Sequence, residues 1–425
     1  MARSNSSGSG LRSPVWAASS PAFKTAGWVA VIVATALSSW SFPRDSLAQD
    51  DPGSDVPALI RTMQYGDEDS RWRAARALAE QDAAAEIVVP ALIEALDHWD
   101  WEVQESAAWA LGQIGAEAEV AIPVLFEILQ DVDSEIGADA AWALGRFGRR
   151  TLPTLLALLR HDDEMIRWRA SSGLKVAGAV AVPALIDALD DEDPRIRRLA
   201  VSTLAGIGKE NAAVVPALLG ALADEDATVR LSAITYLRLL DEWPDAAVPA
   251  AIEALEDDDD RVRSDAAVHL AAMGRQAEAA LPPLTGALKD ENSLVRLAAA
   301  SALWKIDQRA DLAVPVLIQE LDGRNWVHRE KAIDLLGQMG ERAEAAVPAL
   351  IRALDADQDK GWTVGPAAAW TLGAIGAKAK PAVPALIDLL REDDEYGRLH
   401  EASVSALKRI DPGIFERMKQ WAATE

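Results

Sequence analysis

The sequence contains no cysteine among its 425 residues. Disulfide bonds, thiolate zinc sites, cysteine nucleophiles and an N-terminal lipoprotein anchor are therefore excluded. Histidine is scarce as well: five residues lie in different parts of the chain, and no two have the spacing of metal ligands. No serine, aspartate and histidine are arranged as a nucleophile with its base. We predict no catalytic residue, no metal site and no cofactor.

Positive charge is also in short supply. The chain holds 42 Lys and Arg against 67 Asp and Glu, a formal net charge of −25. Residues 1–48 hold four Lys or Arg and one Asp, so residues 49–425 carry −28. A surface this acidic repels phosphate backbones and anionic membranes and favours cationic partners. We expect neither nucleic acid nor a membrane surface as a partner, apart from a possible N-terminal anchor.

Residues 1–48 differ in composition from the rest of the chain. A Ser/Gly-rich stretch precedes the apolar run GWVAVIVATAL at 27–37, and a small-x-small cleavage site ends at Ala48. We predict an export signal over 1–48, a linker over 49–55, and a periplasmic or extracellular location. An uncleaved anchor in the inner membrane is the alternative, because charged residues separate the apolar run from the cleavage site.

From residue 56 onward the chain repeats one phrase, as in VPALIEAL, VPALIDAL and VPALIRAL. A fixed period in this range indicates stacked supersecondary units. The prolines lie 33 residues apart in most intervals, 30 apart in two and 36 apart in the last: Pro57, Pro90, Pro123, Pro153, Pro183, Pro216, Pro249, Pro282, Pro315, Pro348 and Pro384.

Each repeat reads as two helices, A and B, whose positions are numbered as offsets from the proline of the repeat. Helix A begins near the proline, where a missing N–H costs nothing. An Asp at offset +10 caps helix B, as Asp193 does before Pro194. A glycine near +25, such as Gly115, ends helix B with a left-handed C-cap. These glycines belong to no complete nucleotide-binding motif.

The pattern VPALIxAL-DxD-xxVR-xxAAxALGxIG resembles the HEAT repeat, specifically the HEAT-like repeats named after phycobilisome lyases. The resemblance covers eleven repeats over 56–411. It implies an all-α solenoid, or superhelix, whose B helices line the concave side, and it is weak for function because such arrays do many jobs. Residues 412–425 place Ile414, Phe415, Met418 and Trp421 on one helical face, which predicts a C-terminal capping helix.

Two charged positions recur once per repeat, and in HEAT repeats matching residues form an internal Asp–Arg ladder. Such a pair satisfies backbone groups in the turn between helices. An arginine row that binds anions is the alternative. The positions are +14 (Arg71, Arg167, Arg197, Arg230, Arg263, Arg296 and Arg329) and +8 (Asp131, Asp191, Asp224, Asp257 and Asp290), and the arginine row is interrupted at Gln104, Gly137 and Gly365.

Irregular and acidic turns leave further alternatives open. The tenth repeat carries three extra residues within 357–366, either a functional loop or a harmless one. The acidic turns, densest at 256–260, indicate a solvated capping edge. Calcium binding is the alternative, although no EF-hand pattern is present.

Tryptophan, by contrast, is abundant, and eight of the 15 residues fall on one line of helix B that we call the tryptophan stripe. At about 100° per residue, offset +19 points roughly 150° away from the core positions of that helix. The stripe comprises offsets +11 (Trp101, Trp326), +15 (Trp72, Trp168), +19 (Trp109, Trp142 and, after allowing for the three extra residues of the tenth repeat, Trp370) and +22 (Trp304).

The stripe carries the functional hypothesis. Exposed indoles in a concavity contact partners, and in acidic surroundings they favour Lys, Arg or a quaternary amine; stacking on a sugar is a second option. Packing on neighbouring B helices is the structural alternative. The sequence thus predicts a non-catalytic, exported scaffold that binds a protein or peptide, with the first four repeats as the best candidate site.

Two other readings of the function stay open. One is an enzyme or cofactor binder of the lyase or hydroxylase type. The resemblance to deoxyhypusine hydroxylase implies several His-Glu dyads, of which this chain matches only His400-Glu401. The other is a purely structural spacer in the cell envelope.

Overall fold

Helix pairs follow one another along the whole described part of the chain. The computed structural model describes residues 56–81, 85–208, 210–238, 246–354, 364–390 and 398–417, and within these residues it contains helices and turns but no strand. Eleven pairs are present in that part, which confirms the predicted all-α solenoid of about eleven two-helix repeats.

The A helices are α2 (Val56–Tyr65), α4 (Ala85–Ala95), α6 (Ile122–Gln130), α8 (Leu152–Leu158), α10 (Val182–Asp187), α12 (Val214–Gly220), α14 (Ala247–Glu253), α16 (Leu281–Ala287), α18 (Ala310–Leu321), α20 (Val347–Leu354) and α22 (Val383–Leu389). The B helices are α3 (Glu68–Ala79), α5 (Trp101–Ile114), α7 (Gly137–Arg146), α9 (Glu164–Ala177), α11 (Pro194–Ile207), α13 (Ala227–Arg238), α15 (Asp260–Met273), α17 (Ser293–Asp307), α19 (Trp326–Met339), α21 (Val364–Ile375) and α23 (Arg398–Ile410).

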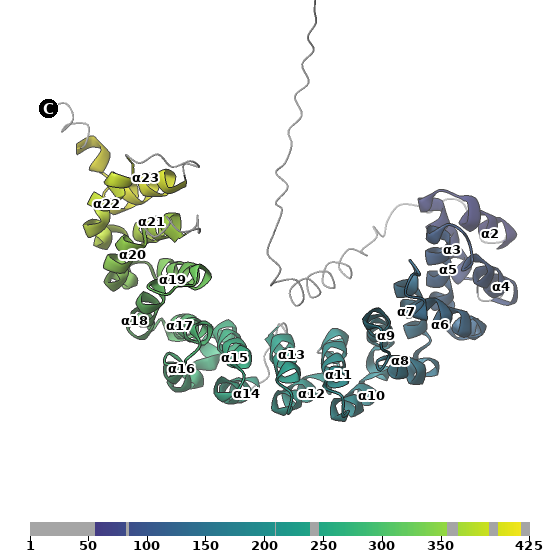
Figure 1. Ribbon diagram of the computed structural model, residues 1–425. Coiled ribbons are helices and arrows are strands. Elements are labelled where there is room, and N and C mark those ends of the chain that lie inside the picture. Colours follow the sequence, from purple (N-terminus) through teal and green to yellow (C-terminus); the bar gives the residue numbers. More distant parts are fainter. Residues whose placement is uncertain are drawn as a thin grey trace, which may run out of the picture. The chain divides into compact units, whose positions relative to one another are not determined.

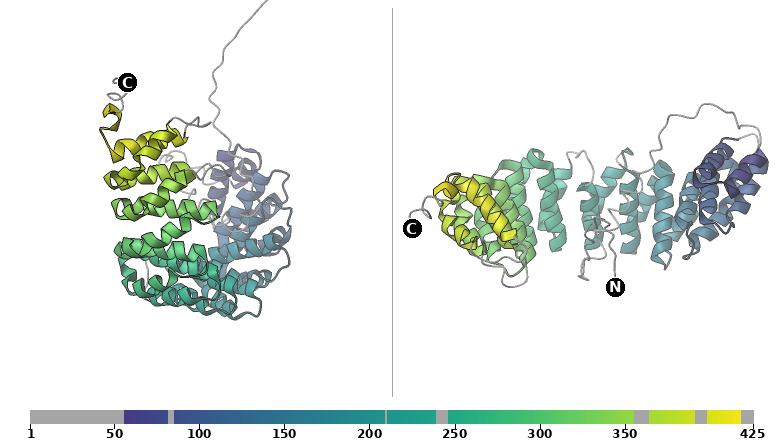
Figure 2. Two further views of the ribbon diagram at one scale, coloured as in Figure 1. Left: turned by 60° about the vertical axis from the view of Figure 1, so that its left-hand side comes forward. Right: turned by 90° about the horizontal axis from the view of Figure 1, so that it is seen from above.

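The two rows of helices are packed unequally. Each B helix packs directly on the B helices before and after it, whereas successive A helices make few direct contacts. Small residues allow this close approach, because Ala107 and Ala140 are fully buried on α5 and α7. Neighbouring repeats therefore bend toward the B side, and the B helices lie on the inner side of the curved row (Figure 1). The views of Figure 2 show the helices of successive repeats following one another in chain order.

Helix starts follow the predicted chemistry. The Asp at offset +10 accepts a hydrogen bond from a first-turn N–H in six repeats, and Asn292 and Asn325 do the same at this offset in two others. The third repeat is the exception, since α7 begins after Ile136 with no side-chain cap. The prolines lie at the predicted helix start in most repeats, but α4 and α18 begin a turn earlier and contain Pro90 and Pro315 in their interior.

Helix ends differ in one respect from the prediction. Positive φ is found at all six glycines near offset +25 that the repeat pattern predicts to end helix B: Gly115, Gly148, Gly178, Gly208, Gly274 and Gly340. Gly115 has φ 65° and ψ −118°, however, so it does not occupy the left-handed helical region. The combination of φ and ψ found at Gly115 is essentially restricted to glycine. The eighth repeat has no glycine there, and Gln308 adopts the ordinary left-handed conformation with φ 52° and ψ 36°.

Several predictions concern residues outside the described part of the chain. They are the export signal and linker over 1–55, most of the insertion in the tenth repeat, and Met418 and Trp421 of the capping helix. Within the described part, Ile414 is buried and Phe415 packs against the core, as a cap requires. No helix among the described residues has the length and apolar character needed to cross a bilayer.

Candidate functional site

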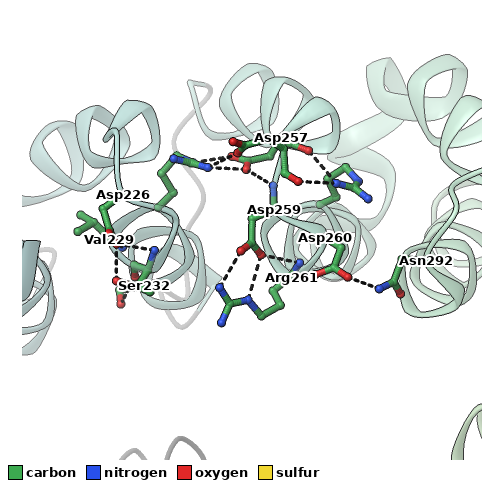
Figure 3. Close-up of polar contacts among 12 residues, drawn as sticks. Asp226, Val229, Ser232, Asp257, Asp259, Asp260, Arg261 and Asn292 are labelled. Atoms are coloured by element: carbon green, nitrogen blue, oxygen red, sulfur yellow. Dashed lines mark hydrogen bonds and ion pairs between the residues drawn. The ribbon is translucent and has the colours of Figure 1, made fainter.

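Three arginines at offset +14 each join two repeats at the turn edge. Each donates from Nε and one terminal nitrogen to both carboxylate oxygens of an Asp in the next repeat, at 2.7–3.0 Å. The remaining terminal nitrogen donates to two backbone carbonyls of the arginine's own turn. We call these pairs the Arg–Asp ladder: Arg197–Asp224, Arg230–Asp257 and Arg263–Asp290. Asp257 lies at its centre in Figure 3. Paired and buried, these arginines are scaffold and not an anion site.

Other members of the two rows find different partners. Arg71 bonds Asp100 and Glu102 of the second repeat at 2.9 and 2.8 Å. Arg296 donates to Glu320 at 2.7 Å. The residue 27 positions after Arg329, where the ladder would continue, lies outside the described residues.

Arg167, Asp191 and Asp131 do not form ladder pairs. Arg167 donates only to the carbonyls of its own turn, because the carboxylate of Asp191 is paired with Arg160. The Asp131 carboxylate accepts the N–H of Asp133 instead. The preceding repeat offers no arginine to Asp131.

In some repeats histidine replaces the Asp at offset +8, and in one repeat glutamine replaces the Arg at offset +14. His98 and His161 lie at offset +8, and their Nδ1 atoms accept the N–H groups of Asp100 and Asp163 at 3.1 and 3.0 Å. Asp191 receives the same type of bond in its own turn. Gln104, at the first interruption of the arginine row, donates to the His98 carbonyl at 2.7 Å. These residues therefore have structural roles in the turns.

The second interruption, at Gly137, is filled from the next repeat. Arg169 on α9 is 5% exposed and donates to the carbonyls of Leu129, Asp131 and Ser134 at 2.6–2.9 Å. A Cβ atom on Gly137 would overlap this guanidinium. Sequence reasoning missed Arg169. The signal that could have revealed it is the coincidence of a glycine at +14 with an extra arginine one repeat later.

All eight residues of the tryptophan stripe lie on B helices, and none of their rings is sealed in the core. Trp101, Trp326, Trp370 and Trp168 are 49%, 49%, 43% and 37% exposed. Trp72, Trp109, Trp142 and Trp304 are half-buried. The stripe thus both packs and presents indole surface.

Contacts within the stripe are concentrated in the first repeats. The rings of Trp72 and Trp109 meet edge to face, with centroids 5.8 Å apart and an interplanar angle of 78°. The Trp142 ring lies over Gly112 of α5, where a Cβ would come within 2.7 Å of its Cζ3. Arg146 stands over the Trp142 ring at 5.9 Å. The structure therefore connects α3, α5 and α7 through the indoles of Trp72, Trp109 and Trp142. Trp168 on α9 makes no ring–ring contact with another described residue.

The later indoles lie apart from this group. Trp304 on α17 is covered by Arg342 at 5.4 Å. Trp370 borders a shallow depression of about 500 Å³ together with His400, Glu401 and Lys408. Among the described residues, no group of three or more His, Asp or Glu is placed to hold a metal ion. A His-Glu pair alone does not make a di-iron site.

Two acids between the indoles were missed by sequence reasoning. Burial, followed by the charges of Asp139, Glu102 and Glu68, raises the pKa of Glu105 to about 7. Burial raises the pKa of Asp139 on α7 to about 6. Neither carboxylate has a Lys or Arg partner in the described part of the chain, unlike the ladder acids.

The spacing of residues along α5 places Glu105 between two tryptophans on the helix surface. Trp101, Glu105 and Trp109 follow one another at intervals of four, so they form one line along the helix surface. Asp139 stands three residues before Trp142 on the adjacent helix. The pattern W-x3-E-x3-W was the available sequence signal for a carboxylate set between indoles.

A buried carboxylate without a partner should cost stability, and this can be measured. The raised pKa of Glu105 means that its favourable contribution is complete below its unfolded value of about 4.5 and is lost as pH rises through about 7. We expect Glu105→Gln to increase the free energy of unfolding at pH 8 by about 1 kcal/mol, allowing for solvent screening of this partly exposed group. At pH 4 the variant and the wild type should unfold alike in urea.

Glu127→Gln is the matched control, because Glu127 is exposed on the outer helix α6. It should change the urea midpoint at neither pH. A loss of stability at pH 8 in Glu105→Gln would show that the carboxylate has a favourable interaction that burial does not outweigh.

Comparison with known proteins bears on the whole array. The family model for HEAT repeats matches residues 56–137, 122–180, 182–271, 248–314 and 314–408. The match is to HEAT repeats in general, so the phycobilisome-lyase type stays a prediction. A search of curated proteins finds no match.

Solved structures share the fold. The chain is similar to yeast importin-beta (Kap95p), at 13% identity and a TM-score of 0.53 over 88% of this chain and 60% of that one. It is also similar to Kap121p bound to Nup53p, at 15% identity and a TM-score of 0.54 over 87% of this chain and 46% of that one. The chain spans about half the length of these karyopherins, and identity this low shows the fold alone. With five family matches from residue 56 to 408, the chain belongs to the HEAT-repeat family.

Proposed function

We propose that the protein is a non-catalytic scaffold that binds a protein or peptide with a basic segment on the inner face of its first four B helices. The observation that carries this proposal is the surface formed by Trp72, Trp101, Trp109, Trp142 and Trp168, which we call the N-terminal indole surface. Its rings are half-buried or exposed on one side of adjacent helices. Large exposed aromatic side chains on a concave surface are typical anchor residues of interfaces.

Charge favours a cationic partner. The region 49–425 carries −28, and the N-terminal indole surface contains two carboxylates that lack a basic partner among the described residues. Indole faces attract Lys and Arg side chains. The structural likeness to Kap121p, which has been solved with Nup53p and with Ste12p, supports a protein as the ligand.

Export remains part of the proposal. Its support is the apolar run and the cleavage site within residues 1–48. We propose that the scaffold works in the periplasm or outside the cell, with the signal either cleaved or kept as an anchor in the inner membrane. Stoichiometric iron in the purified protein would contradict the non-catalytic part of the proposal.

The test uses the two most exposed rings of the N-terminal indole surface. Random peptides displayed on phage are selected on the full chain, and the best peptide is synthesised and titrated. We expect Trp101→Ala combined with Trp168→Ala to weaken its binding at least tenfold, as loss of anchor residues does. Circular dichroism and thermal melting should change little, because both rings are more than a third exposed.

Trp326→Ala combined with Trp370→Ala is the matched control. These rings are equally exposed but belong to the ninth and tenth repeats. If the control pair weakens binding as much as the first pair, or the first pair has no effect, the first four repeats are not the site. Truncation of Trp109 and Trp142 is a less clean test, because both also pack against the core.

A further inference from the structure

We propose that Glu105 and Asp139, together with the indoles of Trp101 and Trp109, form a receptor for one organic monocation carried on an aliphatic stem. A lysine, methyllysine or arginine side chain has this chemistry. The inference rests on the proposed function only in that the cation would belong to the bound partner. In this proposal the positive charge of the ligand is bound by two carboxylates and not by the indoles alone.

The first argument is geometric. Trp101, Glu105 and Trp109 lie on one line of α5, so the carboxylate has an indole one turn before it and another one turn after it. Trp72 on α3 closes this surface by meeting Trp109 at 5.8 Å. Asp139 approaches from α7, close enough for its charge to act on Glu105. Aromatic faces beside carboxylates match a cation whose stem is apolar.

The second argument comes from charge balance. The side chains of the Arg–Asp ladder acids are 9–12% exposed, and each receives an arginine. Glu105 and Asp139 are partly buried, yet in the described part of the chain no Lys or Arg pairs with either. Arg71, a basic group on the neighbouring helix α3, is already held by Asp100 and Glu102. Burying negative charge without a partner is unfavourable, and an external cation would remove that cost.

The chemistry of the surface narrows the ligand class. A calcium ion takes six to eight oxygen ligands, far more than two carboxylates supply, and no group of metal ligands is found among the described residues. A sugar is neutral and would leave the two carboxylates uncompensated. An alkyl cation alone satisfies both the indoles and the acids.

Protonation should oppose this binding. The groups that face Glu105 are Asp139 from α7, Glu102 from its own helix and Glu68 from α3. With the pKa of Glu105 about 7 and that of Asp139 about 6, both are ionised at pH 8 and largely neutral at pH 5. Affinity should therefore fall as the pH is lowered from 8 to 5, by up to about tenfold per unit below pH 7.

The experiment follows the indole N–H signals of the full chain by NMR at pH 8 during titration with n-butylammonium. n-Butyltrimethylammonium and n-butylguanidinium are parallel arms that separate the three possible sources of the cation. n-Butanol and sodium chloride control for the apolar stem and for ionic strength. We expect the signals of Trp72, Trp101 and Trp109 to shift saturably with at least one organic cation, with a Kd on the order of 1–10 mM.

Substitution then tests the carboxylates. Glu105→Gln should weaken the cation at least fivefold, whereas Glu127→Gln, on the outer face, should leave the titration unchanged. Equal shifts with n-butanol, or unchanged cation binding in Glu105→Gln, would overturn the inference. If organic cations fail but the selected peptide still depends on Trp101 and Trp168, the proposed function stands without this site. If the cations bind but binding of the peptide does not depend on those rings, the cation site stands and the proposed function does not.

Discussion

Arg230→Ala is expected to lower the free energy of unfolding by about 3 kcal/mol, because it breaks a buried ion pair by removing one partner. The Arg230 side chain is 10% exposed and that of Asp257 is 9% exposed. Two bonds of 2.7 Å join Arg230 to the two carboxylate oxygens of Asp257. The substitution would leave a buried carboxylate with no cation against it.

The backbone would lose a donor as well. Arg230 also bonds the carbonyls of Asp224 and Glu225 at 2.8 and 3.1 Å, and alanine cannot replace these bonds. Because each repeat is held mainly by its neighbours, the loss should be seen first in the two repeats that Arg230 joins. Urea unfolding measures the total, and hydrogen exchange of the α13 and α15 amides locates it.

Arg261→Ala is the control for this prediction. Arg261 is 58% exposed and pairs with Asp259 across a single turn (Figure 3), so its loss should cost under about 1 kcal/mol. Equal costs in the two variants would mean that Arg230 is effectively solvated.

Acid should reduce the difference in stability between Arg230→Ala and the wild type. Burial opposes ionisation of Asp257, but the hydrogen bonds from Arg230 and from the backbone N–H of Asp259 hold its pKa below 3.8. The pair's contribution is therefore complete above pH 3.8 and is lost as pH falls through the lower, folded-state value. The gap between the two urea curves should accordingly narrow in strong acid and persist at pH 7.

The fold could be predicted because its determinants are local. A proline at a helix start, an Asp such as Asp100 at the N-cap and a glycine such as Gly115 at the end each act within a few residues, and the period repeats them. The chain therefore specifies where each helix begins and ends before any packing is known. Even so, the ψ of Gly115 was not predictable, because it depends on the turn that leads into the next repeat.

The candidate site was less predictable because it depends on neighbouring repeats. Trp142 and Trp370 share offset +19 once the insertion of the tenth repeat is allowed for, but the Trp142 ring lies against Gly112 and is half-buried, while Trp370 is 43% exposed. The pKa of Glu105 results from burial and from acids on three helices. Neither the exposure of these rings nor the pKa of Glu105 follows from the periodicity of one helix. The periodicity predicted on which side of helix B the tryptophans lie, but not how exposed they are.

Gly137→Ala provides the strongest test of such a dependence between repeats, with an expected loss of about 3 kcal/mol. The new Cβ would overlap the guanidinium of Arg169 and force it away from the carbonyls that it bonds. Buried carbonyls and a buried charge would then lose their partners. This cost outweighs the gain of up to about 1 kcal/mol from replacing glycine by alanine in a helix. Thermal and urea unfolding measure the net change.

Gly220→Ala measures the gain from replacing glycine by alanine in a helix without any displacement of a neighbouring side chain. Gly220 has helical dihedral angles, and a Cβ built there meets nothing within 4 Å, so this substitution should stabilise the chain by about 0.5–1 kcal/mol. A loss at Gly220 would mean that glycine is needed in these helices for another reason.

A double-mutant cycle then isolates the contact between the repeats. Arg169→Ala alone should be as costly as Gly137→Ala, because it leaves the same carbonyls without a donor. Once Arg169 is removed, the methyl group at residue 137 has nothing to displace, so the double variant should be no less stable than Arg169→Ala. The two losses would then be strongly non-additive, with a coupling energy of about 3 kcal/mol. Additive losses would show that Gly137 is required by its own helix and not by the arginine of the next repeat.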